Sequence, residues 1–286
     1  MPMSIKAMLP ARFRNDHPVV PVIRLSGAIG ASSGFRSGLS LAGIEVALAK
    51  AFAMKRAPAV ALLVNSPGGA AVQSHLIFKR IRALAEEKGK KVIVAVEDVA
   101  ASGGYMIAVA GDEIVVDASS IVGSIGVLFA GFGFPKLLER FGIERRVHTA
   151  GKSKAMLDPF RPEKEEDVAR LTALQEDVHR DFIALVRSRR RSLVDNPDLF
   201  TGAFWSGSRA VELGLADRVG DLRQVLREAY GENVRMLQIP VGKRSWFRRF
   251  GFGGGSTAFP ADVAGGLVER AITAIEERLL WNRFGL

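Results

Sequence analysis

The sequence contains no cysteine in its 286 residues. Structural disulfides, a thiolate nucleophile and cysteine-ligated zinc are therefore excluded, although the compartment is not decided by that absence. Histidine is also scarce, with four residues in the whole chain. Because histidine is the commonest general base in enzymes, this chain has few candidates for such a base.

Long apolar runs are missing as well. No stretch reaches the roughly 18 consecutive apolar residues of a membrane-spanning helix. The opening sequence, MPMSIKAMLPARFRNDHP, holds no apolar core like that of a signal peptide. We therefore expect residues 1–18 to form a loose leader, and we expect a cytoplasmic protein or one that touches a membrane only at its surface.

The composition is that of an ordinary globular protein, 48% hydrophobic and 24% charged, long enough for one large domain or two modest ones. The net charge of +10 suits either general solubility or an anionic partner such as lipid or nucleic acid. We favour solubility for most of this charge and expect no nucleic acid partner. One basic run, residues 187–191, fits a helix C-terminus and a lipid or nucleic-acid patch about equally well.

Apolar β-branched runs alternate with segments of helical periodicity, which is typical of a parallel sheet with helices on both faces. The first half of the chain predicts strands at 19–25, 59–64, 92–96, 114–116 and 144–149, and helices at 41–55, 72–88, 105–110 and 135–140. The second half predicts a long helix over 161–191, a helix, turn and short strand within 205–220, a helix at 222–230 and a strand at 234–241. We therefore predict an α/β fold whose main domain spans residues 19–241.

Beyond this domain, residues 242–260 are Gly-rich, basic and aromatic, and we interpret them as a linker. Within the linker, Trp246, Phe247 and Phe250 stand among basic residues, a composition that suits a lipid interface or a solvated linker. The pattern of residues 261–286 predicts an amphipathic helix. A partner helix, an oligomer contact and an anionic membrane surface all remain open as its target.

The first candidate for chemistry is a serine at a bend. A buried strand at 92–96 leads into a corner of small residues, 100–104, and then into a short apolar helix. Ser102 stands in this corner, where the first free backbone N–H groups of a helix favour negative charge. Gly103 leaves room for a substrate or another backbone. The alternative is a tight turn with a capping serine.

A second turn, Asn-Ser-Pro-Gly-Gly at residues 65–69, follows the strand at 59–64. Ligands of parallel sheets bind at the carboxyl ends of the strands, so we expect this turn and the corner at 100–104 to face one crevice. Gly69 is where the main chain can approach a carbonyl oxygen most closely, although an ordinary strand-to-helix turn has the same composition.

A serine nucleophile needs a general base, and histidine is the first residue type to consider. None of the four histidines has an obvious carboxylate to orient it, so a Ser-His-Asp triad is unsupported. They stand in the leader, in two charged helices and in the expected strand at 144–149, as His17, His75, His179 and His148.

Lysine is the other type of base. It must be uncharged to accept a proton, and burial in apolar surroundings favours the uncharged form. Lys154 is the candidate, because apolar residues follow it at 155–157. The alternative is a solvated loop lysine, with the same prospects as its neighbour Lys152.

Four short stretches together resemble the signal peptide peptidase A family of serine proteases. Each stretch is a weak signal alone, but all four occur in order, and the resemblance runs from about residue 19 to residue 241. They are Asn-Ser-Pro-Gly-Gly at 65–69, Ala-Ser-Gly-Gly-Tyr at 101–105, Gly-Ser-Ile-Gly at 123–126, and Gly-Lys-Ser-Lys at 151–154 running into Asp-Pro-Phe at 158–160.

The resemblance implies a Ser-Lys dyad on the fold that this family shares with the Clp proteases and the crotonases. Ser102 matches the nucleophile, Lys154 matches the general base, and Ser124 matches a serine that orients the lysine and relays its proton. Gly69 and Gly103 match the backbone donors to the oxyanion. It also implies an apolar, signal-peptide-like or membrane-derived peptide substrate, no metal or cofactor, and a homo-oligomer in which the lysine reaches a neighbouring subunit's serine.

Many members of that family carry an N-terminal membrane anchor, which this sequence does not show. A cytosolic enzyme that touches an anionic membrane through residues 243–252 or the last helix fits the chain better. Two other functions stay open. A crotonase-like acyl-thioester enzyme needs an adenine-nucleotide pocket and carboxylates that the sequence does not place, and the third possibility is a non-catalytic scaffold of the same fold.

Overall fold

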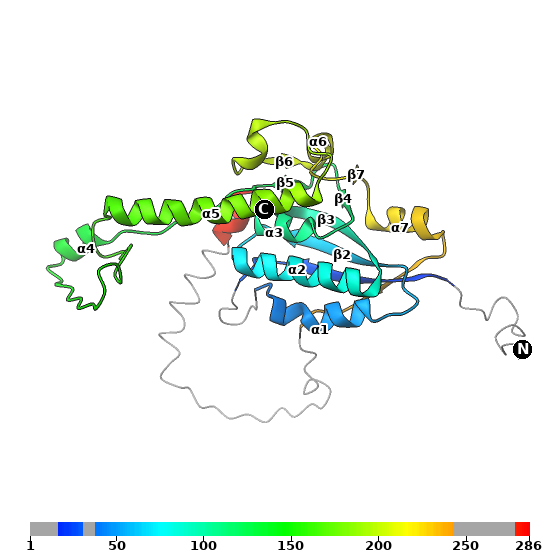
Figure 1. Ribbon diagram of the computed structural model, residues 1–286, viewed down its shortest axis with the longest axis horizontal. Helices are drawn as coiled ribbons and strands as arrows, with labels where there is room; N and C mark the ends of the chain where they lie inside the picture. The colour runs from blue at the N-terminus through cyan, green and yellow to red at the C-terminus, as the bar shows by residue number, and fades with distance from the viewer. Residues whose placement is uncertain (1–16, 31–37, 243–277) are drawn as a thin grey trace, which may run out of the picture.

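The computed structural model describes residues 17–30, 38–242 and 278–286. These residues fold around one central sheet with helices on both of its faces (Figure 1). The strands run in the order β6-β5-β3-β2-β1-β8. Strand β4 pairs with the first half of β3, and β7 pairs with β4. They are β1 (Val19–Ser26), β2 (Ala59–Ser66), β3 (Lys91–Ala101), β4 (Glu113–Val116), β5 (Ile121–Gly123), β6 (Phe204–Ser206), β7 (Arg218–Val219) and β8 (Arg235–Gln238).

The helices are close to those that the sequence periodicity predicts. The 25-residue α5 is the longest of those in the described residues, and it ends in the basic run. They are α1 (Leu41–Phe52), α2 (Ala71–Lys88), α3 (Gly103–Ala108), α4 (Pro135–Arg140), α5 (Glu165–Arg189), a 3-10 helix η3 (Pro197–Phe200), α6 (Gly207–Glu212) and α7 (Leu222–Tyr230).

Strand β3 is the centre of the sheet, because it pairs with β2 on one side and with β4 and then β5 on the other. The pairs are parallel except β5 with β6, so the predicted parallel α/β sheet is confirmed. Parallel strands are buried on both faces and read as continuous apolar runs. Residues 92–96 therefore predict the strand, but β3 continues past Glu97 and Asp98 to Ala101.

Two apolar clusters hold the helices on the sheet. On one face, Ile23, Leu62 and Val94 belong to the cluster that includes residues of α1, α2, α3 and the end of α5. On the other face, Ala61 and Ile93 pack with residues of α7. Every residue of α3 is buried, which confirms the prediction that the segment after Ser102 is a helix enclosed along its whole length.

The stretch from residue 126 to residue 181 contains no buried residue. We call it the arm. It comprises α4, the loops around it and most of α5, and Figure 1 shows it running out beyond the sheet, with α4 at its far end. Within α5, the buried residues Phe182 and Val186 come only near the end. The root of α5 is therefore fixed to the body, while the rest projects into solvent.

The predicted strand at 144–149 is wrong, because these residues have no regular secondary structure and lie on the arm. A strand needs a neighbouring strand to satisfy its backbone groups, and the described part of the arm offers none. Arg145 instead pairs with Asp158 and lies over the ring of Phe160, 4.5 Å from its centre. The neighbour of β5 comes from farther along the chain, as β6.

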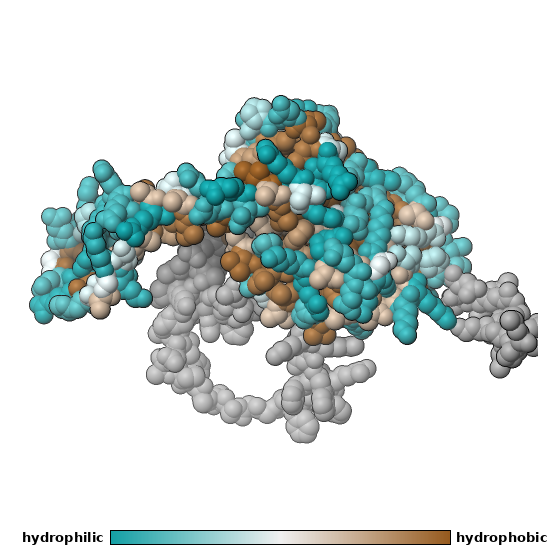
Figure 2. Space-filling view, in the orientation of Figure 1, coloured by the Kyte–Doolittle hydropathy of each residue, from teal (hydrophilic) through white to brown (hydrophobic). Residues whose placement is uncertain are grey.

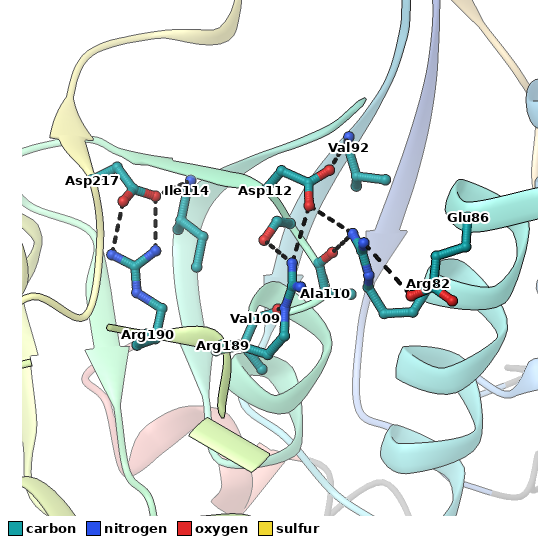
Figure 3. Close-up of polar contacts among 11 residues, drawn as sticks. Arg82, Glu86, Val92, Val109, Ala110, Asp112, Ile114, Arg189, Arg190 and Asp217 are labelled. Atoms are coloured by element: carbon teal, nitrogen blue, oxygen red, sulfur yellow. Dashed lines mark hydrogen bonds and ion pairs between the residues drawn. The ribbon is translucent and has the colours of Figure 1, made fainter. Parts of the chain in front are cut away.

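The basic run forms the C-terminal end of α5, and two of its arginines are bonded to the rest of the protein. Arg190 is 7% exposed and donates to both carboxylate oxygens of Asp217 over 2.8 and 2.9 Å (Figure 3). The same carboxylate accepts the backbone N–H of Ile114 at the start of β4. This pair ties the end of α5 to the sheet, as the helix C-terminus interpretation predicts.

Arg189 makes a second tie, to the turn that follows α3. It donates to the carbonyl oxygens of Val109 and Gly111, at 3.0 and 2.9 Å, and to Asp112 at 3.1 Å (Figure 3). Arg82 of α2 pairs with the same carboxylate at 2.8 Å. Two arginines of the basic run, Arg189 and Arg190, are therefore engaged in hydrogen bonds and ion pairs within the protein.

The end of the chain returns to the sheet. Residues 278–282 are helical, and Phe284 packs against Val99 and Ala101 near the end of β3, with its ring 5.1 Å from that of Phe204. This agrees with the last part of the predicted amphipathic helix. Residues 1–16 of the leader, residues 261–277 of that helix and the linker from 243 onward, with Trp246, Phe247 and Phe250, lie outside the described residues.

Candidate active site

Ser102 occupies the corner between β3 and α3 in a backbone conformation that side chains seldom adopt. Its φ is 51° and its ψ is −120°. A non-glycine residue held at such angles costs on the order of 1–3 kcal/mol, and strain of this kind concentrates at functional sites. The hydroxyl makes no capping hydrogen bond to α3. The alternative of a plain capping serine is therefore wrong.

Ser124 lies directly beside this corner. Strands β3 and β5 pair Ala101 with Gly123, and the backbone N–H of Ser102 donates to the carbonyl of Gly123 over 2.8 Å. Ser124 is 3% exposed and also has a positive φ, 53°. The sheet thus places two strained serines next to each other at the carboxyl ends of adjacent strands.

The glycine turn after β2 approaches the same corner. A Cβ placed on Gly68 would lie 2.9 Å from the Cβ of Ser102 and 3.0 Å from the nitrogen of Gly103. A Cβ on Gly69 would lie 2.0 Å from the carbonyl oxygen of Ile29. Only glycine fits this approach. The two turns therefore lie against each other as expected, while a crevice that they share remains a prediction.

Backbone amides are present at this corner without partners. Within the described residues, the N–H groups of Gly69 and Gly103 make no recorded hydrogen bond, whereas Gly68 donates to Ser66 Oγ at 3.2 Å. Ser66 Oγ in turn donates to the carbonyl of Gly27 at 2.7 Å, which fixes the turn. Free N–H groups beside a serine are what an oxyanion requires. The role of these two glycines remains a prediction.

Tyr105 is the titratable side chain closest to Ser102 along the helix, and it is structural. It is fully buried, and its hydroxyl donates to the carbonyl of Leu215 over 2.8 Å. Burial raises the pKa of Tyr105 far above the usual value. Tyr105 therefore stays a neutral phenol and does not serve as a base for Ser102.

Lys154 lies in a turn on the arm, between α4 and α5, and is exposed. Ser102 lies in the body (Figure 1). From Glu165 at its start to Phe182, its first buried residue, α5 extends about 25 Å at 1.5 Å per residue. The structure brings together Ser102, Ser124, Gly69 and Gly103, but it leaves Lys154 outside this group and in solvent within a single chain.

The histidines do not provide a base for Ser102 through any recorded hydrogen bond. His148 is exposed on the arm and His17 is exposed at the start of the chain. Burial, followed by the charge of Lys79, lowers the pKa of His75 on α2, while Asp181 opposes this shift. None of these three has a hydrogen-bonded carboxylate within the described residues.

His179 is the residue that sequence reasoning missed. Its Nε2 lies 3.1 Å from the carbonyl oxygen of Ile125, the residue after Ser124. The two residues are 54 positions apart in the sequence, and the helical pattern of α5 gives no sign of the contact. Only the position of α5 over the Gly-Ser-Ile-Gly loop creates it.

The described residues offer neither a metal-binding cluster nor a membrane-spanning helix. No group of three or more histidine, aspartate or glutamate side chains lies close enough together there to hold a metal ion. None of the helices in residues 17–30, 38–242 and 278–286 combines the length and the apolar character needed to cross a bilayer.

A strained serine at a strand-to-helix corner, with free backbone amides beside it at the carboxyl end of a parallel sheet, is the arrangement in which a serine nucleophile is held. Comparison with known families gives the next step. The model described as peptidase family S49 matches residues 84–234, so this chain belongs to that family. The matched range includes Ser102, Ser124 and Lys154.

Two named relatives are similar to this chain, and the name of the first agrees with this assignment. A protein of Synechocystis sp. named putative protease slr0021 is 34% identical over 206 residues, 71% of this chain and 71% of that protein. A protein of Brucella abortus named Na(+)/H(+) antiporter NhaA is 53% identical over 291 residues, which cover this whole chain but 39% of that protein. The chain thus spans about two fifths of the length of its Brucella relatives.

Among solved structures, this chain is similar to a substitution mutant of a protein named 1510-N membrane-bound stomatin-specific protease. The TM-score is 0.50 at 16% identity, over 78% of this chain and 98% of that one. At this identity the similarity concerns the fold. This likeness agrees with the α/β fold described above and with membership of the S49 family.

Proposed function

We propose that this protein is a serine endopeptidase in which Ser102 is the nucleophile and Lys154 of a neighbouring copy is the general base. One observation carries the proposal. The strained serine and its amides are assembled in the body, while the matching lysine lies on an exposed arm of the same chain. A second copy supplies the base that the single chain lacks.

The surface of the arm supports assembly. It carries many exposed apolar side chains, and apolar residues are interspersed with polar ones along its visible face (Figure 2). So many exposed large apolar side chains on one segment favour an interaction site there. The exposed set on the arm comprises Val127, Leu128, Phe129, Phe132, Phe134, Leu137, Phe141, Ile143, Met156, Phe160, Val168 and Leu174.

The chemistry is acyl transfer to a serine and then to water. The free amine of Lys154 takes the proton of Ser102 Oγ as this oxygen bonds to the peptide carbonyl carbon. The N–H groups of Gly69 and Gly103 donate to the carbonyl oxygen as it becomes negative. The peptide C–N bond breaks as the lysine ammonium protonates the leaving amine, and water then releases the acyl group by the same steps.

The lysine is uncharged in this scheme because the interface excludes water around it. An ammonium loses hydration when it is buried, which favours the neutral amine. The hydroxyl of Ser124, buried beside Ser102, orients the amine. These two roles explain why a lysine that is exposed in one chain acts as a base in the assembly.

The proposed substrates are apolar, signal-peptide-like or membrane-derived peptides. The apolar residues at 127–134 directly follow the Gly-Ser-Ile-Gly loop and suit such a peptide. The two Brucella relatives add support for a site near a membrane, because the part equivalent to this chain belongs to a longer polypeptide named for an antiporter. Peripheral contact with an anionic membrane through residues 243–252 or the last helix remains a prediction.

Mixed assemblies test the shared site. Ser102→Ala and Lys154→Ala subunits are each expected to be inactive against an apolar reporter peptide. When the two are mixed and allowed to exchange, sites that combine an intact serine with an intact lysine regain activity, up to about a quarter of the wild-type level if pairing is random. Failure of the mixture to recover activity, with subunit exchange shown by a fluorescent label, would rule out a shared site.

The two alternatives have their own tests. A crotonase-like acyl-thioester enzyme binds coenzyme A, so calorimetric titration with coenzyme A is expected to be flat for a peptidase. A non-catalytic scaffold does not react at Ser102. Covalent labelling of Ser102 by a fluorophosphonate, absent in Ser102→Ala, therefore separates the peptidase from the scaffold.

A further inference from the structure

We propose that His179 is a positioning residue that holds Ser124 in its working conformation; this rests on the proposed function, in which Ser124 orients the incoming lysine. The imidazole Nε2 lies 3.1 Å from the carbonyl oxygen of Ile125. A carbonyl oxygen is only an acceptor, so Nε2 carries a hydrogen and donates. The contact therefore fixes the tautomer of the ring as well as the position of the peptide group.

Ser124 needs this support because its backbone is strained. Its φ of 53° lies in the left-handed region, and such a residue persists only where its surroundings fix it from several sides. On one side, its N–H donates to the carbonyl of Ala203 over 2.7 Å. On the other side, His179 holds the carbonyl of Ile125. The loop is thus tied to two different elements across the strained residue.

Packing restricts the same loop further. Ile125 is fully buried, and a Cβ on Gly126 would lie 3.1 Å from the Cα of Gly202. On the side of α5, His179 contacts the loop through the carbonyl oxygen of Ile125. Without the imidazole, Ser124 is free to relax toward negative φ, which moves its hydroxyl away from the direction of the incoming amine.

The position of His179 is itself well determined. It precedes the first buried residue of α5, Phe182, by less than one turn, and Arg189 and Arg190 bond the end of the helix to the body. Helix α5 therefore has two roles in our proposal. In its C-terminal half, His179 holds the loop of Ser124, the serine that receives a lysine. The N-terminal end of the helix follows the loop that delivers Lys154 to another copy.

The first experiment compares two substitutions of the full-length assembled protein. His179→Leu removes the donor, whereas His179→Gln keeps an N–H group that can reach the carbonyl. We expect kcat to fall about tenfold in His179→Leu and about twofold in His179→Gln, with KM unchanged in both, because the substrate does not touch this residue. Equal losses in the two variants, or a loss confined to KM, would overturn the proposal.

A matched control is Arg180→Leu. Arg180 is the next residue on the helix, is exposed, and pairs with Asp177 at 3.1 Å. We expect it to leave kcat and the thermal midpoint unchanged. If His179→Leu lowers the midpoint by more than a few degrees, His179→Gln and the double substitution described next decide the question.

A double substitution shows whether His179 acts through Ser124. In a Ser124→Ala background, His179→Leu is expected to produce no further loss, because the hydroxyl that it positions is already gone. Losses that multiply would show an independent effect and overturn the proposal.

Mixed assemblies separate this inference from the proposed function. His179→Leu is placed either on the Lys154→Ala subunit, which supplies Ser102, or on the Ser102→Ala subunit, which supplies the lysine. We expect the loss only when it shares a chain with Ser102 and Ser124. A loss on the lysine-supplying chain would mean that His179 acts through Lys154 of its own chain, and it would overturn the proposal. If the mixture without His179 substitutions is inactive, the shared site fails, and the double substitution still decides the role of His179.

Discussion

The backbone N–H of Ser102 donates to the carbonyl of Gly123 over 2.8 Å, which holds Ser102 and Ser124 at adjacent strand ends, both with positive φ. The parallel register of β3 and β5, with Ala101 opposite Gly123, creates this relationship. Two strained residues at neighbouring positions require surroundings that fix them. The expected consequences of this arrangement can be measured.

The first prediction concerns the dyad. Ser102→Ala and Lys154→Ala are each expected to lower peptide cleavage by at least about a thousandfold, because nucleophile and base act as one unit. Circular dichroism and the thermal midpoint are expected to stay near those of the wild type. Lys152→Ala is the control, since Lys152 is exposed on the same turn, and near wild-type cleavage by Lys154→Ala would remove Lys154 from the mechanism.

The second prediction concerns the glycine turn. Gly69→Ala forces a methyl group against the carbonyl oxygen of Ile29, 2.0 Å away, at a φ of +140°. We expect loss of cleavage and a fall in the free energy of unfolding of at least about 1–3 kcal/mol. Gly27→Ala is the control: its φ of +106° is also unfavourable, but no atom lies within 4 Å of the added methyl group. We expect it to lower the free energy of unfolding by less, as measured by chemical denaturation, and to leave the corner at Ser102 intact.

The third prediction concerns the arm. Phe132→Asp and Phe141→Asp place charges on side chains that are 75% and 68% exposed in the single chain. If a second copy covers them, these substitutions lower the assembly mass in light scattering and the activity together, while the secondary structure is retained. Val46→Asp is the control, because Val46 is 79% exposed on α1. An unchanged assembly in both arm variants would show that another surface joins the copies.

The fourth prediction concerns the root of α5. Arg190→Met leaves Asp217 without its bidentate partner, and breaking a largely buried pair costs about 3 kcal/mol of unfolding free energy. Arg209→Met removes one partner of an exposed pair with Glu212 and is expected to change the free energy by less than about 1 kcal/mol. Urea denaturation measures both, and similar values for the two would show that the pair does not anchor the helix.

The fifth prediction concerns pH. Burial and the charge of Lys79 lower the pKa of His75 in the folded protein below its unfolded value. The folded state then binds fewer protons, so this contribution to stability is complete above the unfolded pKa of about 6.5 and is lost as the pH falls through the lower folded value. His75→Leu should flatten the fall in thermal midpoint between about pH 7 and about pH 5. A slope equal to that of the wild type would contradict this role.

Local patterns predict much of this protein. The alternation of β-branched runs and helical segments gives the parallel sheet, and the turns at 65–69 and 100–104 meet at one edge because parallel strands share their carboxyl ends. The interpretation of the basic run as a helix end is confirmed at Arg189 and Arg190. The strand predicted at 144–149 is wrong because its alternating pattern lacks a neighbouring strand, and pairing partners are not encoded within the segment.

The sequence by itself determined the serine at a corner of small residues and the glycines that allow close approach, because glycine is the residue type that permits positive φ and a close backbone contact. The tertiary structure alone decided that Gly68 touches Ser102, that His179 reaches Ile125, and that Lys154 stands on an exposed arm. Contacts between residues dozens of positions apart follow from strand register and helix packing. These form only when the whole chain buries its apolar surface.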